Sequence, residues 1–201
     1  MPTLLGCVFL LIAVTALGWW RPTLFDRSRN GPGWAWIGPI VMFGLSIATL
    51  ASLNGGHWSD ELILWSVLGG IGVGIGEETI TRGTMVVGLR TKYPELKVWL
   101  FSTLLFSALH FPNVFFGLAA GKMVVQLLFT FIMGSLFYAL RRLSGTLILC
   151  ILLHGLWDSS IFLTTPTHSD KLAASALLYP VAIVCAFFVI RRIKDARLPL
   201  G

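Results

Sequence analysis

Two adjacent carboxylates, Glu77 and Glu78, end a run of apolar and glycine residues, and Arg82 follows four residues after Glu78. Residues at i and i+4 share one face of a helix, so Glu78 and Arg82 can form an ion pair. Glu77 points about 100° away from Glu78 around the same helix. One acid can therefore be neutralised by the arginine while the other faces a cavity.

Two histidines and an aspartate supply partners for these acids. His110 ends the stretch FSALH, and the stretch HGLWD begins with His154 and ends with Asp158, again at i and i+4. A carboxylate and an imidazole that converge can hold and deprotonate a water molecule. A second imidazole with a polar partner can donate to a developing oxyanion. This set suffices for amide hydrolysis without a serine or cysteine nucleophile.

Composition places these residues inside a membrane. Of the 201 residues, 56% are hydrophobic and 12% are charged, about half the charged share of a soluble domain. The three cysteines, Cys7, Cys150 and Cys185, lie in apolar runs without a CxxC pair. They indicate small buried hydrophobes rather than a disulfide or zinc framework. The sequence therefore predicts an all-α, polytopic membrane protein forming one domain over residues 1–201.

A membrane span needs about 20 mostly apolar residues. The hydrophobic pattern predicts seven spans, the first retained rather than cleaved as a signal peptide: 3–20, 34–53, 60–90, 97–111, 117–140, 144–163 and 172–191. The third is longer than a bilayer requires and must tilt, protrude or break. Its glycines, which come just before the two acids, are typical of helices that approach a neighbour closely.

Charges alternate between the loops and predict an orientation. Basic residues follow the first, third, fifth and seventh spans, in that order: Arg21, Arg27, Arg29; Arg90, Lys92, Lys97; Arg141, Arg142; and Arg191, Arg192, Lys194, Arg197. Acids and histidines follow the second and sixth spans: His57, Asp60, Glu61; and His168, Asp170, Lys171. Basic loops face the cytoplasm, so we expect an outside N-terminus and a cytoplasmic C-terminus. The net charge of +6 thus reflects which loops face the cytoplasm, and no nucleic-acid partner is expected.

The ionisable residues fall at one predicted depth. Glu77 lies 13 residues before Arg90, His110 lies 13 after Lys97, and His154 lies 12 after Arg142. In straight helices each is about 18–20 Å from a cytoplasmic anchor. Three helices that run in different directions would therefore bring the acids and imidazoles together.

These three stretches resemble a known family. EETITR (77–82), FSALH (106–110) and HGLWD (154–158) are similar, in order, to the EExxxR, FxxxH and HxxxN/D motifs of the CAAX-protease and bacteriocin-processing family. That family comprises intramembrane glutamic endopeptidases of the type II CAAX prenyl endopeptidase kind. The resemblance covers roughly residues 60–165.

The resemblance implies a role for each motif residue. Glu77 corresponds to the glutamate that activates water, and His110 to the residue that helps position it. Glu78 and Arg82 correspond to the pair that orders the site. No cofactor and no metal are implied.

His154 and Asp158 correspond to the oxyanion side of the family site. Two positions depart from the usual pattern: Thr81 stands where Phe is frequent, and Asp158 where Asn is frequent. An ionised Asp158 would repel an oxyanion, so it must be protonated or must orient and charge His154. We favour the second, which leaves His154 as the donor.

Three other functions use the same residues. A zinc metalloprotease could take its ligands from the acids and histidines, although no HExxH is present. A proton-coupled transporter would use an acid and histidine chain, but no internal repeat is visible. A non-catalytic, immunity-type scaffold would not need the intact motifs.

The sequence thus predicts a glutamic endopeptidase that cleaves near the membrane, close to the C-terminus of a membrane-anchored or membrane-tailed precursor. The expected partners are that protein or peptide substrate and the lipid bilayer. The expected location is a prokaryotic cytoplasmic membrane. The substrate assignment rests on analogy.

Overall fold

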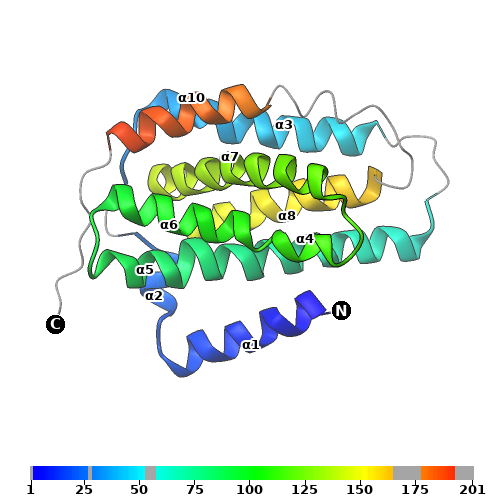
Figure 1. Cartoon of the computed structure of the whole chain (residues 1–201), viewed down its shortest axis with the longest axis horizontal. Coiled ribbons are helices and arrows are strands. Elements are labelled where there is room, and N and C mark those ends of the chain that lie inside the picture. Colours follow the sequence, from blue (N-terminus) through cyan, green and yellow to red (C-terminus); the bar gives the residue numbers. More distant parts are fainter. Residues whose placement is uncertain (1, 27–28, 53–57, 165–177, 193–201) are drawn as a thin grey trace.

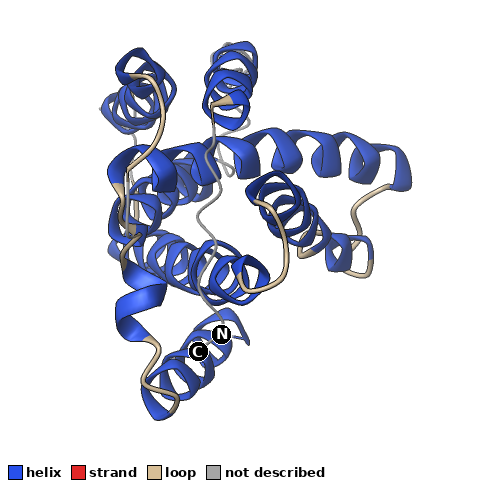
Figure 2. Ribbon diagram, turned by 90° about the vertical axis from the view of Figure 1, so that its left-hand side faces the viewer, coloured by secondary structure: helices blue, strands red, loops and turns tan. Residues whose placement is uncertain are grey.

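The computed structural model describes residues 2–26, 29–52, 58–164 and 178–192, and for residues 2–4 it describes the backbone alone. The described chain consists of helices joined by loops (Figures 1 and 2). The helices are α1 (Pro2–Ala16), α2 (Trp20–Leu24), η1 (Gly33–Trp36), α3 (Ile37–Ala51), α4 (Asp60–Glu78), η2 (Thr79–Thr84), α5 (Met85–Arg90), α6 (Glu95–Ala108), η3 (Phe111–Val114), α7 (Ala120–Ser144), α8 (Leu147–Thr164) and α10 (Leu178–Arg191). The predicted all-α class is therefore confirmed.

The longest helical segment carries the paired acids. Ser59 caps α4 by accepting a hydrogen bond from the Leu62 amide at 3.2 Å, and Asp60 and Glu61 in the first turn suit the positive end of the helix dipole. The segment continues through η2, which is a π-helix, into α5. The predicted span 60–90 is thus one continuous helical segment with a widened turn directly after the acids.

Glycines bring α4 against α8, as the sequence predicts. A Cβ on Gly74 would lie 2.6 Å from the Ile151 carbonyl oxygen and 2.9 Å from the Gly155 amide nitrogen. At Gly70 a Cβ would lie 2.5 Å from the Gly155 carbonyl oxygen. These helices touch backbone to backbone, a spacing that only small residues permit. On the other side of α4, the Cys7 thiol of α1 donates to the Gly72 carbonyl oxygen at 2.8 Å.

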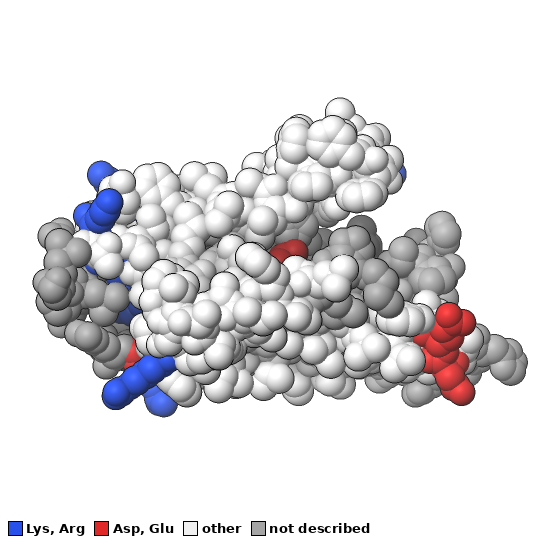
Figure 3. Space-filling view, turned by 90° about the horizontal axis from the view of Figure 1, so that it is seen from below, with Lys and Arg blue, Asp and Glu red and all other residues white. Residues whose placement is uncertain are grey.

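The core lies among α3, α7, α8 and α10, and it contains Leu136, Phe137 and Leu147. The outer surface is also apolar: Phe9, Ile40 and Leu152 are among many large hydrophobic side chains that are exposed. Seen from below, lysine and arginine side chains gather mainly at one end and most of the acidic ones at the other, with uncharged surface between them (Figure 3). This distribution is typical of a protein surrounded by lipid.

Four helical segments in the described chain are long and apolar enough to cross a membrane: Gly33–Ala51, Asp60–Arg90, Ala120–Ser144 and Leu147–Thr164. They correspond to four of the seven predicted spans. Leu5–Ala16 and Leu178–Arg191 are apolar but shorter, and α6 has 14 residues. The protein is therefore a multi-pass membrane protein, while the count of seven spans and the orientation stay predictions.

The observed helices differ from the predicted boundaries by a few residues, and three of their ends are informative. The first ends at Ala16, before Gly18 with a φ of +66°. The fourth ends at Ala108, so His110 lies in the turn that leads into η3. The fifth runs on to Ser144, where Gly145 adopts a left-handed conformation that glycine tolerates. Predictions for 172–177, Arg27, His57, His168, Asp170, Lys171, Lys194 and Arg197 lie outside the described residues.

Candidate active site

Glu78 lies at the centre of the candidate site and is fully buried. Its Oε1 accepts a hydrogen bond from Arg82 Nη1 at 3.0 Å, and this contact is the predicted i,i+4 ion pair. The same oxygen lies 3.0 Å from Nδ1 of His154 on α8. The second contact joins the third and sixth predicted spans, and spacing within one helix could not reveal it.

Arg82 is held on several sides. Its Nη1 also donates to the Thr81 hydroxyl at 2.7 Å, and its guanidinium carbon lies 3.9 Å from the ring centroid of Phe106 on α6, a cation–π distance. Gly134 leaves room for the guanidinium, because a Cβ there would lie 2.7 Å from Nη2. Thr81, where the family pattern frequently has Phe, thus provides a polar contact to the arginine.

His154 lies between two carboxylates. Nδ1 faces Glu78, and Nε2 lies 3.6 Å from Oδ2 of Asp158. The imidazole stacks on Phe137 with ring centroids 4.6 Å apart and planes inclined by 23°. A separation of 3.6 Å is too long for a hydrogen bond. Asp158 therefore lies near Nε2 of His154 without forming a hydrogen bond to it.

His110 is fixed by the end of α6, the helix that precedes it. Its Nδ1 lies 3.0 Å from the Phe106 carbonyl oxygen. A carbonyl can only accept, so Nδ1 carries the hydrogen, and in the neutral ring Nε2 keeps its lone pair. The Phe106 ring lies 5.3 Å from the ring of His110 and 5.6 Å from that of His154. The two histidines are thus held on a shared phenylalanine.

Glu77 differs from its neighbour in that its carboxylate forms no hydrogen bond or ion pair with the described residues, whereas Oε1 of Glu78 is engaged by Arg82 and His154. Oε2 of Glu77 is buried and has no hydrogen-bond partner within the described part of the chain. Glu77 directly precedes Glu78 at the end of α4, which places it beside the same site. Buried polar atoms normally have a partner, so this oxygen is suited to a water molecule. No hydrogen bond or ion pair in the described residues joins Glu77 to His110.

The π-helix was not predicted from the sequence, because periodicity alone reads this segment as a continuous α-helix. Its widened turn begins at Thr79, next to Glu78, and the Thr84 hydroxyl donates to the Ile80 carbonyl oxygen at 3.1 Å. π-turns occur frequently at functional sites. Arg141 Nη1 from α7 donates to the Arg82 carbonyl oxygen, and the same atom reaches the Thr23 carbonyl oxygen at 2.8 Å. The backbone of the motif arginine is therefore anchored from two other elements.

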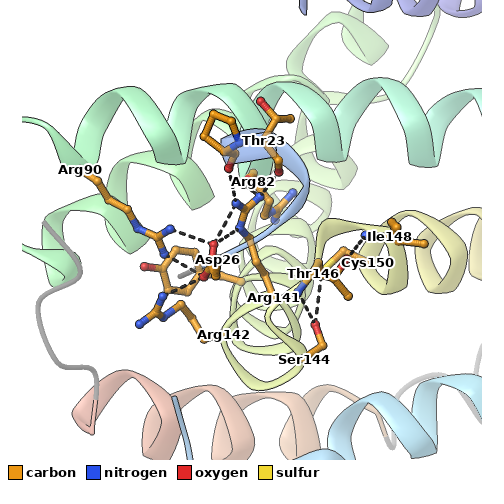
Figure 4. Close-up of polar contacts among 12 residues, drawn as sticks. Thr23, Asp26, Arg82, Arg90, Arg141, Arg142, Ser144, Thr146, Ile148 and Cys150 are labelled. Atoms are coloured by element: carbon orange, nitrogen blue, oxygen red, sulfur yellow. Dashed lines mark hydrogen bonds and ion pairs between the residues drawn. The ribbon is translucent and has the colours of Figure 1, made fainter. Parts of the chain in front are cut away.

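A buried polar cluster lies beyond this anchor, at the end of the helices that the sequence assigns to the cytoplasmic side (Figure 4). Asp26 Oδ1 lies 2.9 Å from both Arg90 Nη1 and Arg141 Nη2, and its Oδ2 lies 2.8 Å from Arg142 Nη1. Glu95 pairs with Arg90 and accepts from the Tyr138 hydroxyl. The sequence predicts loop charges at these arginines, but the structure buries all three.

Asp26 lies outside the membrane-spanning segments, and its side chain is fully buried. Burial alone would raise the pKa of its carboxyl. The guanidinium groups of Arg141, Arg90 and Arg142 outweigh burial and hold the pKa well below its ordinary value. The carboxylate therefore stays charged at all ordinary pH values.

No cluster of three or more His, Cys, Asp or Glu side chains placed to hold a metal ion occurs in residues 2–26, 29–52, 58–164 and 178–192. The structure thus brings Glu77, Glu78, Arg82, His154 and Asp158 together, with His110 joined to them through Phe106.

Comparison with known proteins agrees with the resemblance noted from the motifs. The family model for the type II CAAX prenyl endopeptidase Rce1-like family matches residues 58–160, a little over half of the chain. No curated protein matches, and no solved structure matches. The matched range contains all six candidate site residues. The chain belongs to the type II CAAX prenyl endopeptidase Rce1-like family and is a multi-pass membrane protein of that peptidase family.

Proposed function

We propose that the protein is an intramembrane glutamic endopeptidase in which Glu77 activates the attacking water. The observation that carries this proposal is the contrast between the two glutamates. Glu78 is bound to Arg82 and His154 through its Oε1, whereas the Glu77 carboxylate, whose Oε2 is buried, forms no hydrogen bond or ion pair with the described residues. A carboxylate in that state is suited to bind a water molecule and take its proton.

His110 would assist at the same water. Its hydrogen is committed to the Phe106 carbonyl, so Nε2 can accept a hydrogen bond and orient the water toward the scissile carbonyl. Attack forms a tetrahedral intermediate whose oxygen carries negative charge. When the C–N bond breaks, the proton held by Glu77 passes to the leaving amine.

His154 would supply the hydrogen bond to the oxyanion. Its Nδ1 is engaged by Glu78, so donation must come from Nε2. Asp158 lies 3.6 Å from Nε2, too far to saturate it but near enough to favour a protonated ring. This geometry supports Asp158 as the residue that orients and charges His154.

The substrate we propose is a membrane-anchored or membrane-tailed protein or peptide that is cleaved near its C-terminus. Family membership supports a peptide substrate and a bilayer setting. The spread of the helices and of the polar cluster over the chain supports residues 1–201 acting as one protease domain. We place the protein in a prokaryotic cytoplasmic membrane, without a cofactor and without nucleic acid.

Co-expression with candidate membrane-tailed precursors tests the proposal through the size of the precursor. We expect wild type to process one precursor and Glu77→Gln to lose processing by at least 100-fold, since the base is removed while the shape is kept. Glu61→Gln, an exposed acid on the same helical segment, is the matched control and should process normally.

Chelation separates this mechanism from the zinc alternative. Processing by purified wild type should be unchanged by a chelator, and metal analysis should find no stoichiometric zinc. Retained processing by folded Glu77→Gln would refute the glutamic mechanism. Loss of processing on chelation, with recovery on added zinc, would establish the metalloprotease instead.

A further inference from the structure

Two cavities meet at Leu149, at the start of α8. One has a volume of about 330 Å³ and lies between α3 and α8. The other has a volume of about 520 Å³ and lies beside the turn from α7 to α8. Leu149 lines both. The two cavities therefore adjoin at this residue, and together we call them the recess, with an apolar part and a polar part.

The apolar part faces the surrounding lipid. Its lining includes Trp36, Ile40 and Phe43 from the η1–α3 segment and Leu149, Leu152 and Leu156 from α8. Ile40 is 62% exposed and Leu152 is 61% exposed, so the recess opens sideways. From Leu149 to Leu156 it extends about 10 Å along the helix, which fits within one leaflet of a hydrocarbon core about 30 Å thick.

The polar part of the recess contains an exposed arginine side chain. Arg29 lines it together with Ser144 and Thr146. The Arg29 side chain lies across Gly145, where an added Cβ would be 3.0 Å from its Cγ. Within the described residues no carboxylate forms an ion pair with Arg29. The Thr146 hydroxyl oxygen accepts from the Ile148 amide at 3.2 Å, which leaves its hydrogen free to be donated.

The buried cluster behind this recess adds positive charge. Asp26 lines the polar part, but three arginines surround its carboxylate. Arg90, Arg141 and Arg142 face only two carboxylates in the described chain, those of Asp26 and Glu95. Arg142 Nη2 is buried and has no hydrogen-bond partner there. The polar part is therefore electropositive, and Arg29 adds a further charge at its surface.

We propose that this recess binds an anionic glycerophospholipid, with the phosphate at Arg29 and the Thr146 hydroxyl and one acyl chain between α3 and α8. Basic pockets between helices at a membrane face are suited to anionic head groups. The lateral opening and the length of the apolar part suit an acyl chain from the same leaflet.

The lipid site is separate from the proposed catalytic site. On α8, Leu152 and His154 are two positions apart and so point about 160° away from each other around the helix. The lipid would rest on the α3 side, while His154 faces Glu78 of α4. The inference therefore stands whether or not the chain hydrolyses peptides.

Native mass spectrometry of the purified, delipidated full chain tests the proposal. The probes are phosphatidylglycerol and phosphatidylcholine with identical acyl chains, and glycerol 3-phosphate as a head group without a tail. We expect phosphatidylglycerol to bind about tenfold more tightly than phosphatidylcholine, and glycerol 3-phosphate to show no binding.

Matched variants assign the two parts of the recess. Arg29→Ala should weaken phosphatidylglycerol binding about fivefold, as expected for one basic residue near a membrane surface. Leu152→Trp should fill the apolar part and weaken both lipids. The controls are Arg21→Ala and Leu128→Trp, at exposed positions that line neither cavity, and both should bind as wild type.

Equal binding of the two lipids, or equal losses in the variants and their controls, would overturn the site. Tight binding of glycerol 3-phosphate alone would show a simple phosphate site and would overturn the lipid assignment. Arg29 and Leu152 are both exposed, so the unfolding temperatures of these variants should match wild type and loss of fold should not confuse the result.

Discussion

At the scale of single residues, adjacent glutamates in one helix have different surroundings. Glu78 is buried, and its Oε1 is shared by Arg82 and His154. The Glu77 carboxylate, whose Oε2 is buried, forms no hydrogen bond or ion pair with the described residues. Because neighbouring positions on a helix point about 100° apart, only one of the two acids can join the arginine and the histidine. The other remains for chemistry.

This contrast predicts different stability effects for the two glutamine variants. Glu78→Gln leaves the buried Arg82 without its counter-charge, and breaking a buried ion pair costs about 3–5 kcal/mol. Glu77→Gln removes a charge that has no ion-pair partner among the described residues, so stability should stay the same or rise. Thermal unfolding in detergent would measure both, and processing of a precursor should be lost in both.

A double variant separates stability from catalysis at Glu78. Glu78→Gln combined with Arg82→Met removes the orphaned charge and should recover most of the lost stability, because a buried pair can often be replaced by apolar groups. Processing should stay lost, since His154 still lacks its carboxylate. Equal unfolding temperatures for the single and double variants would contradict this account of the pair.

At the scale of the elements, the site depends on how closely α4 approaches α8. Gly70 and Gly74 present bare backbone to Ile151 and Gly155. That contact sets the distance at which His154 meets Glu78, while the π-turn after α4 directs Arg82 toward the same carboxylate. A small change in the separation of α4 and α8 would therefore change the positions of Glu78, Arg82 and His154 relative to one another.

Alanine substitutions along α4 test this dependence. In Gly74→Ala the new Cβ would meet backbone atoms 2.6–2.9 Å away, and overpacking of this kind costs about 1–3 kcal/mol. We expect lower stability together with a loss of processing of at least tenfold. Gly69→Ala is the matched control, because its Cβ would meet Phe162 at an ordinary 3.4 Å. Unfolding temperature and processing rate are measured together for both variants. Equal values for Gly74→Ala and Gly69→Ala would contradict the dependence of the site on the close approach of α4 to α8.

At the scale of the whole molecule, charge is gathered at the ends and at the site. The Asp26 cluster ties the segment after α2 to α5 and α7, and Arg141 extends it to the backbone of η2. Four elements are thus held together at the end nearest the lipid recess, while apolar side chains cover the flanks.

The Asp26 cluster predicts a pH-dependent stability. The folded-state pKa of Asp26 lies below its ordinary value, so its contribution is fully present above the unfolded pKa of about 3.9. It is lost as pH falls below that value through the folded-state pKa. Asp26→Asn should therefore lower the unfolding temperature by a constant amount from pH 7 to about pH 5, and the difference should shrink below about pH 4. A difference that stayed constant to pH 3 would argue against the ion pairs.

Orientation in the membrane is also a property of the whole chain. We propose an outside N-terminus and a cytoplasmic C-terminus, because the basic loops follow the first, third, fifth and seventh predicted spans. A reporter fused to the C-terminus that is active only in the cytoplasm should be active, and one active only outside should be silent. The reverse result would mean that the number of spans is wrong by an odd number or that the orientation is inverted.

The sequence by itself determined the all-α class, four of the membrane-spanning helices and the three motifs. Hydrophobic runs of about 20 residues predict membrane helices without knowledge of their neighbours, and the Glu78–Arg82 pair follows from i,i+4 spacing alone. The family match over residues 58–160 agrees with the order of those motifs.

Only the tertiary structure decided what lies between the helices. The contact of His154 with Glu78, the π-turn, the burial of Arg90, Arg141 and Arg142, and the recess at Leu149 all depend on packing. Sequence periodicity shows which face of a helix is apolar, but the same apolar pattern serves a helix partner and a lipid equally well. The partner of each buried charge is therefore decided by which helices the packed glycines bring together.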